Sequence, residues 1–212
     1  MSKHFTLSED NYEAVKAAAV ASLRAGDVLC MALDGAYVYA AYAFDHNAVH
    51  AIHRMRESQP GTQLQVVVGE ISTILGISTN FSGDIKKIAE AFWPGPLTLL
   101  LTPNRGLAWD LGDGGELDQF AARMPSRKFI RDVLSSTGPV AIASASIAGM
   151  APMTNINFVQ GAEVALFIDE GELEGFEPSS IVEMREGALH LMREGALSLE
   201  ALTEIAPILP NS

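Results

Sequence analysis

Three histidines lie on one predicted helix with a spacing that can bind a metal ion. His46, His50 and His53 are four and three residues apart, so their side chains share one helical face. Structural zinc sites usually take four protein ligands, whereas this segment offers no fourth ligand and no cysteine cluster. The pattern therefore favours a solvated histidine face over a metal site. A melting temperature that zinc leaves unchanged would exclude the metal.

The segment Phe92–Thr98 is the most specific string in the chain, and it reads Phe-Trp-Pro-Gly-Pro-Leu-Thr. Two prolines fix the backbone around a glycine that permits close approach. The string supplies no acid, base or charge, so it predicts a rigid corner beside the loops that bind a ligand. The sequence contains no Gly-x-x-x-x-Gly-Lys loop, no Gly-x-Gly-x-x-Gly and no nucleophile elbow, which argues against the classes built on those motifs.

The elements that must position these residues begin with a predicted helix. Thr6 and Glu9 have capping-box spacing, and apolar residues recur at helical intervals until Gly26. The apolar run 27–33 is typical of a buried strand, and Asp34-Gly35 predicts a turn. The next expected elements are a short helix beginning within Tyr37–Tyr42, a helix over Asp45–Arg56 and a strand over Leu64–Val68.

The rest of the chain alternates between strand and helix patterns. Apolar residues from Ile85 to Phe92 have helical spacing, and the corner ends that helix. The repeat of Met184–Leu189 at Met192–Leu197 is too short for a solenoid and suits a hairpin. Expected strands are Leu97–Leu101, Gln119–Arg123, Val140–Ala143, Glu163–Ile168, Ser180–Met184 and Ala188–Met192, and expected helices are Lys128–Leu134 and Leu199–Ile205. This alternation predicts a mixed sheet with helical cover.

Length and composition indicate one domain over residues 1–212. The chain is 48% hydrophobic and 19% charged, close to a globular average. Its single cysteine, Cys30, lies in an apolar run, which suits a buried thiol and a reducing compartment. No apolar stretch reaches the ~18 residues of a membrane span, so we expect a cytoplasmic protein without membrane contact. The net charge of −12 opposes general binding to nucleic acid.

Several strings, in one order, resemble the YrdC-like family. The Phe92–Thr98 corner matches that family's helix-to-strand corner almost letter for letter. After it come four further matches: Arg123-Met124-Pro125 to Arg-x-Pro, Ser144–Gly149 to Ser-Ala-Asn-x-Ser-Gly, Pro178–Val182 to Pro-Ser-Thr-Ile-Val, and Arg193–Ala196 to Arg-x-Gly-Ala. The resemblance spans roughly residues 10–205. It implies an α/β fold with a twisted mixed sheet, helices on its faces and a concave nucleotide-binding surface.

The resemblance also implies an activity. Family members make threonylcarbamoyl-adenylate from threonine, bicarbonate and ATP, releasing pyrophosphate, and the product feeds a tRNA modification. Such transfers depend mainly on positioning and charge neutralisation, so ATP would be accompanied by Mg²⁺. If active, the protein is therefore expected to be an ATP-dependent nucleotidyltransferase.

The cationic residues of the predicted catalytic site admit two alignments. The family's Lys-x-Arg aligns with Arg56-Glu57-Ser58, which puts Ser58 on the nucleotide side. A small shift instead pairs Arg54 with Arg56. Both arginines are candidates for phosphate contact, and the alternative is an exposed helix end, where arginine is common. Ser144 and Ser146 complete the expected catalytic set, with Ser146 in place of the family's asparagine.

The substrate side is assigned in the same way. Asp34 and Tyr37 remain from the family's Thr-Asp-Thr-x-Tyr loop, both threonines of which are absent, and Val67 stands where many relatives carry histidine. Arg123, followed by Pro125, would hold the threonine carboxylate, and its alternative is a surface ion pair. Ser180 and Arg193 are the remaining nucleotide-binding candidates, and their alternative is an ordinary hairpin residue.

These departures leave two functions to distinguish. The first is an active threonylcarbamoyl-adenylate synthase. The second is a divergent paralogue that lost this activity and binds a nucleotide or double-stranded RNA, or acts in regulation. Calorimetry with ATP separates both from a purely structural domain. RNA contact would need a local basic patch, drawn from Arg54, Arg56, Lys86, Lys87, Arg123, Arg127 and Lys128.

Overall fold

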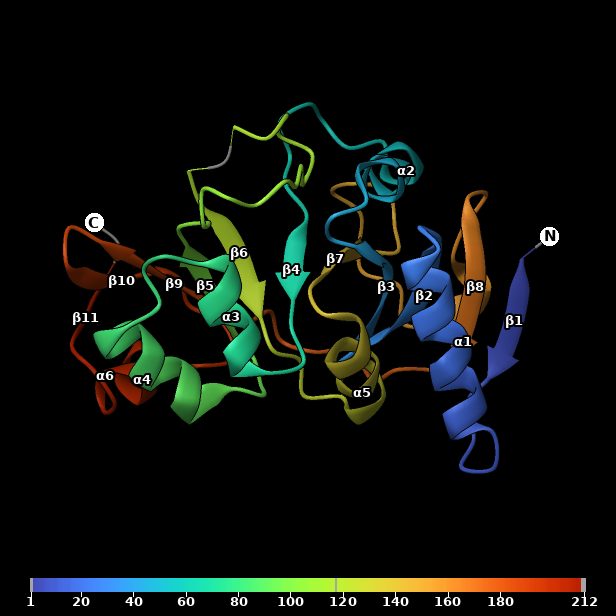
Figure 1. Ribbon diagram of the computed structural model, residues 1–212. Helices are drawn as coiled ribbons and strands as arrows, with labels where there is room; N and C mark the ends of the chain where they lie inside the picture. The colour runs from blue at the N-terminus through green and yellow to red at the C-terminus, as the bar shows by residue number, and fades with distance from the viewer. Residues whose placement is uncertain (1, 117, 211–212) are drawn as a thin grey trace.

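The computed structural model describes residues 2–116 and 118–210. Its eleven strands form one mixed sheet, in the order β1-β8-β2-β3-β7-β4-β6-β5-β9-β10-β11 (Figure 1). The N-terminal half provides β1 (Lys3–Thr6), α1 (Tyr12–Arg24), β2 (Val28–Leu33), β3 (Ala36–Tyr42), α2 (His46–Arg56), β4 (Gln65–Val67), α3 (Ile71–Ile77), α4 (Gly83–Phe92) and β5 (Leu97–Leu101). The remainder provides β6 (Phe120–Arg123), α5 (Lys128–Thr137), β7 (Val140–Ser144), the 3₁₀ turn η1 (Ile156–Phe158), β8 (Val164–Asp169), β9 (Ser180–Arg185), β10 (Ala188–Arg193), α6 (Leu199–Thr203) and β11 (Ile208–Pro210).

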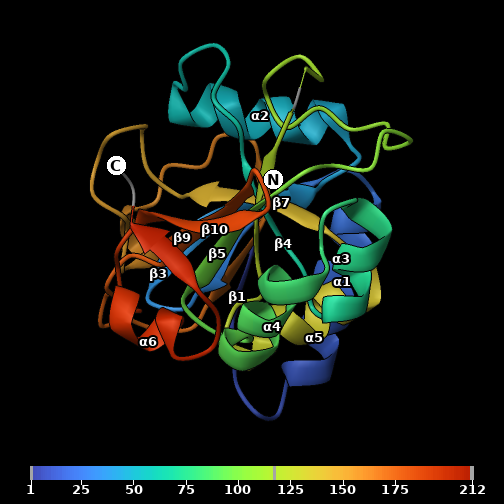
Figure 2. The same cartoon turned by 90° about the vertical axis from the view of Figure 1, so that its left-hand side faces the viewer.

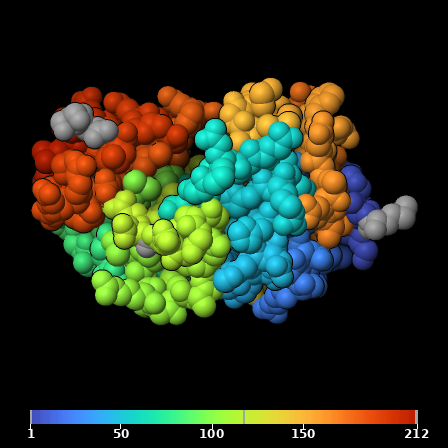
Figure 3. All heavy atoms as spheres, turned by 90° about the horizontal axis from the view of Figure 1, so that it is seen from above, coloured from blue at the N-terminus to red at the C-terminus, as the bar shows by residue number. Residues whose placement is uncertain are grey.

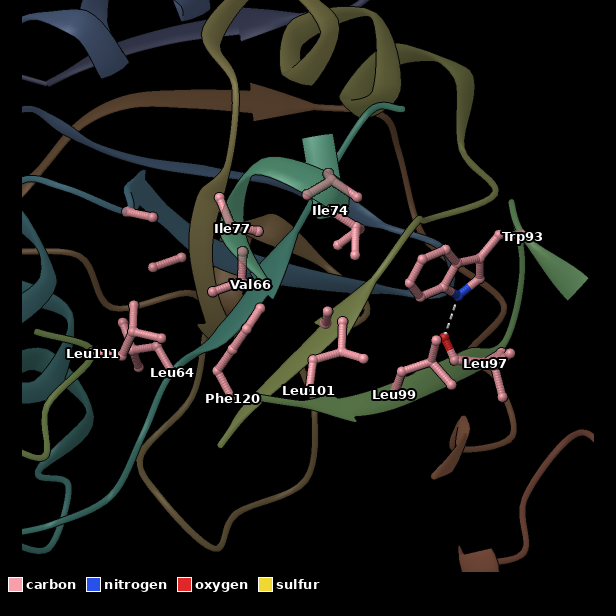
Figure 4. Packing of buried hydrophobic residues seen from close by; sticks show 14 of the residues in the cluster. Leu64, Val66, Ile74, Ile77, Trp93, Leu97, Leu99, Leu101, Leu111 and Phe120 are labelled. Atoms are coloured by element: carbon pink, nitrogen blue, oxygen red, sulfur yellow. Dashed lines mark hydrogen bonds between the residues drawn. The ribbon is translucent and has the colours of Figure 1, made fainter. Parts of the chain in front are cut away.

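Two apolar layers cover the two faces of the sheet. On one face, α1 and α5 pack over β2, β3, β7 and β8. On the other, the larger layer includes apolar residues of α2, α3, α4 and α6, and Figure 2 shows these helices from the side of β10. Figure 4 shows Ile74 and Ile77 of α3 beside Val66 of β4 within this second layer. The layer under α1 and α5 reaches β4 only at Val67, and it contains no residue of β6, β5 or β9.

The sequence predicted most of the strands. The run 27–33 forms β2, and the hairpin expected from the repeat is formed by β9 and β10, joined at Glu186 and Gly187. The second copy of the repeat leaves the sheet after Arg193. The short elements α3 and β11 were not predicted. Among the described residues, no helix combines the length and hydrophobicity needed to cross a lipid bilayer.

Two expectations near the N-terminus were wrong. The first element is the strand β1, paired with β8, and α1 begins after Asn11 instead of Thr6. The Asn11 side chain accepts from the Ser8 amide and donates to the Thr6 carbonyl, so it fixes the turn before α1 and makes no capping bond to the helix. The segment Tyr37–Tyr42 belongs to β3, because its backbone is paired on one side with β2 and on the other with β7. Pairing on both sides overrides the helical preference of its alanines.

A cleft on the uncovered part of the sheet

A cleft of about 420 Å³ extends from the edge of the layer under α1 and α5, at Leu33, Val38 and Ile142, across β6, β5 and β9. The strand register explains which side chains meet there. Val38 pairs with Ser144, and Thr98 pairs with both Arg123 and Ile181, so these side chains project from one face. The lining residues are Leu33, Ala36, Val38, Gln65, Thr98, Ala121, Arg123, Ile142, Ala143, Ser144, Pro152, Phe176, Pro178, Ser179, Ile181 and Arg193. The cleft thus combines an apolar floor with two guanidinium groups and several hydroxyls.

The Phe92–Thr98 corner positions Arg123. Within the corner, Trp93 is buried, and its indole Nε1 donates a hydrogen bond of 2.7 Å to the Leu97 carbonyl, which Figure 4 shows as a dashed line. The Gly95 carbonyl accepts from Arg123 Nε at 3.0 Å. A Cβ atom at Gly95 would lie 2.4 Å from the Phe92 carbonyl oxygen, so the corner requires glycine at this position. The predicted corner therefore supports a cleft residue through backbone atoms alone.

Asp34 is the second support of Arg123. The two side chains form an ion pair and are only 10% and 5% exposed. Asp34 Oδ1 also accepts from the Ser126 amide at 2.9 Å and from the Ser126 hydroxyl. Burial lowers the pKa of Arg123, while the charge of Asp34 acts in the opposite direction. Protein donors thus occupy both Asp34 oxygens, and this residue positions Arg123 instead of contacting a substrate directly.

Tyr37 and Pro125 were predicted to bind substrate, but neither lines the cleft. Tyr37 is fully buried. Its hydroxyl donates to the Gly171 carbonyl at 2.7 Å and accepts from the Glu170 amide at 3.0 Å. Its neighbour Val38 points to the cleft, so Tyr37 points to the opposite face of β3. Burial raises the pKa of the Tyr37 hydroxyl. Pro125 is also buried. For both residues a structural role replaces the expected contact.

The predicted nucleotide residues divide between the cleft and the core. Arg193 lines the cleft, and its Nε and Nη2 donate to the Ser179 carbonyl at 3.1 and 2.7 Å. The positive charge of Arg193 contributes to lowering the pKa of Arg123, after the larger effect of burial. Ser180, by contrast, is fully buried, and its hydroxyl accepts from the amides of Gly195 and Leu197. Ser180 therefore fixes the backbone after β10 and lies outside the cleft.

The structure separates the two arginines of α2. Arg56 Nη1 donates to the Ser144 and Ser146 carbonyls, the latter at 2.8 Å, and burial lowers its pKa. Arg54 forms an exposed bidentate pair with Glu163. Neither guanidinium lines the cleft, so the predicted phosphate contact of Arg54 is not supported. Arg56 instead holds the backbone of the 144–146 segment.

The two serines of this segment differ in position. Ser144 lines the cleft, whereas Ser146 is 5% exposed and lies outside it. Their hydroxyls are 2.9 Å apart and hydrogen-bonded. Ser58, expected on the nucleotide side, also lies outside the cleft, and its buried hydroxyl has no partner among the described residues. Ser144 is thus the one predicted catalytic residue whose side chain reaches the cleft.

The three histidines of α2 contact a loop instead of solvent alone. His46 and His53 approach the Ala108 and Leu111 carbonyls at 3.3 and 2.9 Å, and His50 lies 3.4 Å from Asp110. Figure 3 shows α2 beside this loop on the face toward the viewer. His46 and His50 are exposed, as the predicted solvated face requires, and the three side chains also contact the loop that contains Ala108, Asp110 and Leu111. No group of three possible metal ligands occurs in the part of the chain that the structure describes.

Sequence reasoning missed three polar residues of the cleft floor. Gln65 Nε2 donates to Thr98 Oγ1 at 2.9 Å, and Thr98 Oγ1 lies 2.8 Å from Ser179 Oγ. Thr98 belongs to the Phe92–Thr98 corner, which was predicted to be purely structural. Ser179 belongs to the Pro178–Val182 string, in which only the adjacent Ser180 was predicted to bind the nucleotide. Gln65 had no motif signal, because only the sheet register brings it beside Thr98.

A second groove of about 790 Å³ adjoins the cleft and shares Gln65 and Ala121 with it. Its lining is acidic: Glu116, Asp118 and Glu183. Glu183 is buried and accepts from Gln119 Nε2 at 2.6 Å. The cleft with its two arginines is therefore bounded on one side by negative charge, which opposes an anion in the groove.

The fold and cleft define an α/β protein with two arginines in a cleft on one face of a mixed sheet. The family model Sua5_yciO_yrdC, described as "Telomere recombination", matches residues 21–195. The chain belongs to this family, which confirms the resemblance drawn from its motifs.

Similar proteins support this assignment. The chain is 30% identical to a putative threonylcarbamoyl-AMP synthase of Mycobacterium leprae, over 92% of this chain and 90% of that protein. It is 31% identical to a protein of the same name from Mycobacterium tuberculosis, over 88% and 87%.

Solved structures show the same fold. Pyrococcus abyssi Sua5 complexed with L-threonine matches with a TM-score of 0.82 at 24% identity, over 99% of this chain and 62% of that one. Escherichia coli YciO matches with a TM-score of 0.79 at 20% identity, over 95% and 100%. The chain thus spans less than two thirds of the archaeal protein.

Proposed function

We propose that this protein is a threonylcarbamoyl-AMP synthase. The observation that carries the proposal is the pair Arg123 and Arg193 in one cleft, in a chain about 30% identical to proteins named for this activity. The reaction joins threonine, bicarbonate and ATP. The threonine nitrogen is carboxylated with loss of water, and the carbamate oxygen then attacks the α-phosphorus of ATP, whose bond to pyrophosphate breaks.

The cleft residues have distinct roles in this proposal. Arg123, held by Asp34 and Gly95, binds the threonine carboxylate through its remaining N–H groups. Arg193 and the Ser144 hydroxyl face the phosphates. Arg56 and Ser180 support the backbone around them, and the Ser146 hydroxyl is hydrogen-bonded to that of Ser144. This arrangement acts by positioning and by neutralising charge, which is how proteins accelerate such transfers.

Mg²⁺ would enter with ATP. Magnesium usually keeps several waters and is bound by phosphates with one or two carboxylates. The described residues provide no preformed cluster of metal ligands, and Asp34 is fully used by Arg123 and Ser126. These residues fit a metal held mainly by the nucleotide, whose charge would help to neutralise the phosphates.

The remaining expectations extend the proposal. Residues 1–212 would form a single domain, which a single cooperative unfolding transition would support. The protein would act in the cytoplasm. RNA contact has little structural support, because six of the seven candidate cations pair with an acid: Arg54, Lys86, Lys87, Arg123, Arg127 and Lys128. RNA binding that salt weakens steeply would restore that idea.

The test is release of pyrophosphate by the purified protein with bicarbonate, ATP and Mg²⁺. We expect release only when threonine is added, with serine and valine as comparison substrates. Release that does not depend on threonine, or no release at all, would contradict the proposal. A variant with Arg123→Met should be inactive, and the exposed Arg54→Met should retain activity.

One observation favours a second function, a paralogue that binds a nucleotide without the synthase activity. Neither arginine of α2 reaches the cleft, although the family's cationic pair aligns with this segment. Calorimetry separates the two functions. The paralogue would bind ATP while threonine produces neither heat nor turnover, whereas the synthase binds both.

A further inference from the structure

We propose that Gln65 determines amino-acid specificity, its amide oxygen accepting a hydrogen bond from the side-chain hydroxyl of the substrate. The proposal rests on the function proposed above and deepens it. Gln65 opens β4 and lies in the cleft, whereas Val67 is fully buried in the layer under α1 and α5. The strand thus brings a polar side chain to the cleft two residues before the position at which the resemblance predicts histidine.

The orientation of the Gln65 amide is fixed from one side. Its Nε2 donates to Thr98 Oγ1 at 2.9 Å. The same Thr98 oxygen is hydrogen-bonded to Ser179 Oγ, 2.8 Å away, and either hydroxyl can be the donor of that bond. Thr98 and Ser179 are 2% and 6% exposed, so the chain of bonds is protected from water. This arrangement holds the amide nitrogen toward Thr98. Gln65 lines both the cleft and the adjoining groove, and the proposal assigns its amide oxygen to the cleft.

The amide oxygen of Gln65 is an available acceptor. Within residues 2–116 and 118–210 it has no protein donor, and it is not among the buried atoms without a partner. A carboxylate and a carbonyl near the cleft are already engaged. Asp34 accepts from Arg123 and Ser126, and the Ser179 carbonyl accepts from Arg193.

The chemistry of threonine selects the group that this acceptor would bind. Its carboxylate suits the guanidinium groups, and its amino nitrogen must stay free to attack carbon in the proposed reaction. The remaining polar group is the side-chain hydroxyl, which needs an acceptor when it is removed from water. The methyl group can rest on the apolar floor, which includes Ile142 and Ala121. Gln65 therefore distinguishes threonine from an amino acid that lacks the hydroxyl.

The experiment compares kcat/KM for threonine and for 2-aminobutyrate, which keeps the methyl group and lacks the hydroxyl. We expect Gln65→Leu to lower the threonine to 2-aminobutyrate ratio about tenfold, the size of one hydrogen bond of about 1.4 kcal/mol. The loss should lie mainly in the KM for threonine. Gln65→Glu retains an acceptor oxygen and should recover more of the ratio than Gln65→Leu.

The matched control is Gln63→Leu, the same chemical change at an exposed position two residues earlier, outside the cleft. Its ratio should equal that of the unmodified protein. An unchanged ratio in an active Gln65→Leu variant would overturn the specificity role while leaving the synthase proposal standing. If the unmodified protein gives neither turnover nor heat of binding with threonine, the synthase proposal and this one both fail. Melting temperatures identify a variant that has merely unfolded.

Discussion

Arg123 and Asp34 form an ion pair buried between β6 and the turn after β2, with side chains only 5% and 10% exposed. Removing one partner of such a pair leaves an uncompensated charge away from water. Asp34→Asn should therefore lower the free energy of unfolding by about 3 kcal/mol. It should also raise the KM for threonine, because Arg123 loses a support. Urea unfolding and threonine-dependent pyrophosphate release measure the two effects.

Asp84→Asn is the matched control, because Asp84 pairs with Lys87 where both side chains are well exposed. Such surface pairs contribute about 1 kcal/mol or less. Equal effects of the two substitutions would show that the Arg123 pair has no special role.

The fold could be predicted from sequence wherever local pattern and tertiary pairing agree. The run 27–33 and the Phe92–Thr98 corner are examples, because apolar continuity and proline geometry act locally. Tyr37–Tyr42 was mistaken for a helix because only its pairing with two distant strands makes it β. Asn11 could not be identified as the cap while β1 was unknown.

The site was harder to predict than the fold, because motif identity does not say where a side chain points. Arg123 and Arg193 line the cleft, whereas Tyr37 and Ser180 lie in the core. Successive side chains of a strand point to opposite faces, so Tyr37 and Val38 lie on different sides of the sheet. A helix was expected at this segment from the sequence, so this alternation was not predicted. Gln65 became a site residue only through a register that no local pattern encodes.

Substitutions of Arg56 and Arg54 test which arginine of α2 contributes to stability and to the KM for ATP. Arg56→Met removes the donor to two carbonyls of the 144–146 segment and should cost about 2 kcal/mol of stability. It should also raise the KM for ATP, because Ser144 loses its fixed backbone. Arg54→Met removes an exposed pair with Glu163 and should change either quantity little. A larger change in stability or in the KM for ATP for Arg54→Met than for Arg56→Met would contradict the structural roles given to the two arginines.

Glu170 makes stability depend on pH. Burial raises its pKa, Arg127 opposes this shift, and one carboxylate oxygen is buried without a partner among the described residues. The folded state therefore binds this proton more tightly than the unfolded state, so the contribution of Glu170 to stability falls as pH rises through its folded pKa. Glu170→Gln should raise the melting temperature at neutral pH.

That gain should disappear as pH falls below the ordinary glutamate value, where both states are protonated. Differential scanning calorimetry over a range from acidic to neutral pH measures it. Glu172→Gln, an exposed change in the same loop, is the control and should show no such trend. A gain independent of pH would mean that the Glu170→Gln substitution acts through packing and not through charge.

Arg193 should carry the affinity for ATP. Its side chain is held by the Ser179 carbonyl and lies close enough to Arg123 for their charges to oppose each other, so an anion between them would relieve the repulsion. Arg193→Met should weaken ATP binding between about tenfold and a hundredfold, the range for hydrogen bonds to a charged group. Arg185→Met, an exposed change on the same hairpin, should leave the calorimetric Kd for ATP unchanged.

Because the phosphates carry most of the charge, AMP should lose less affinity than ATP in the Arg193→Met variant. An equal loss for both would place Arg193 beside the nucleoside or the α-phosphate and not beside the β- and γ-phosphates.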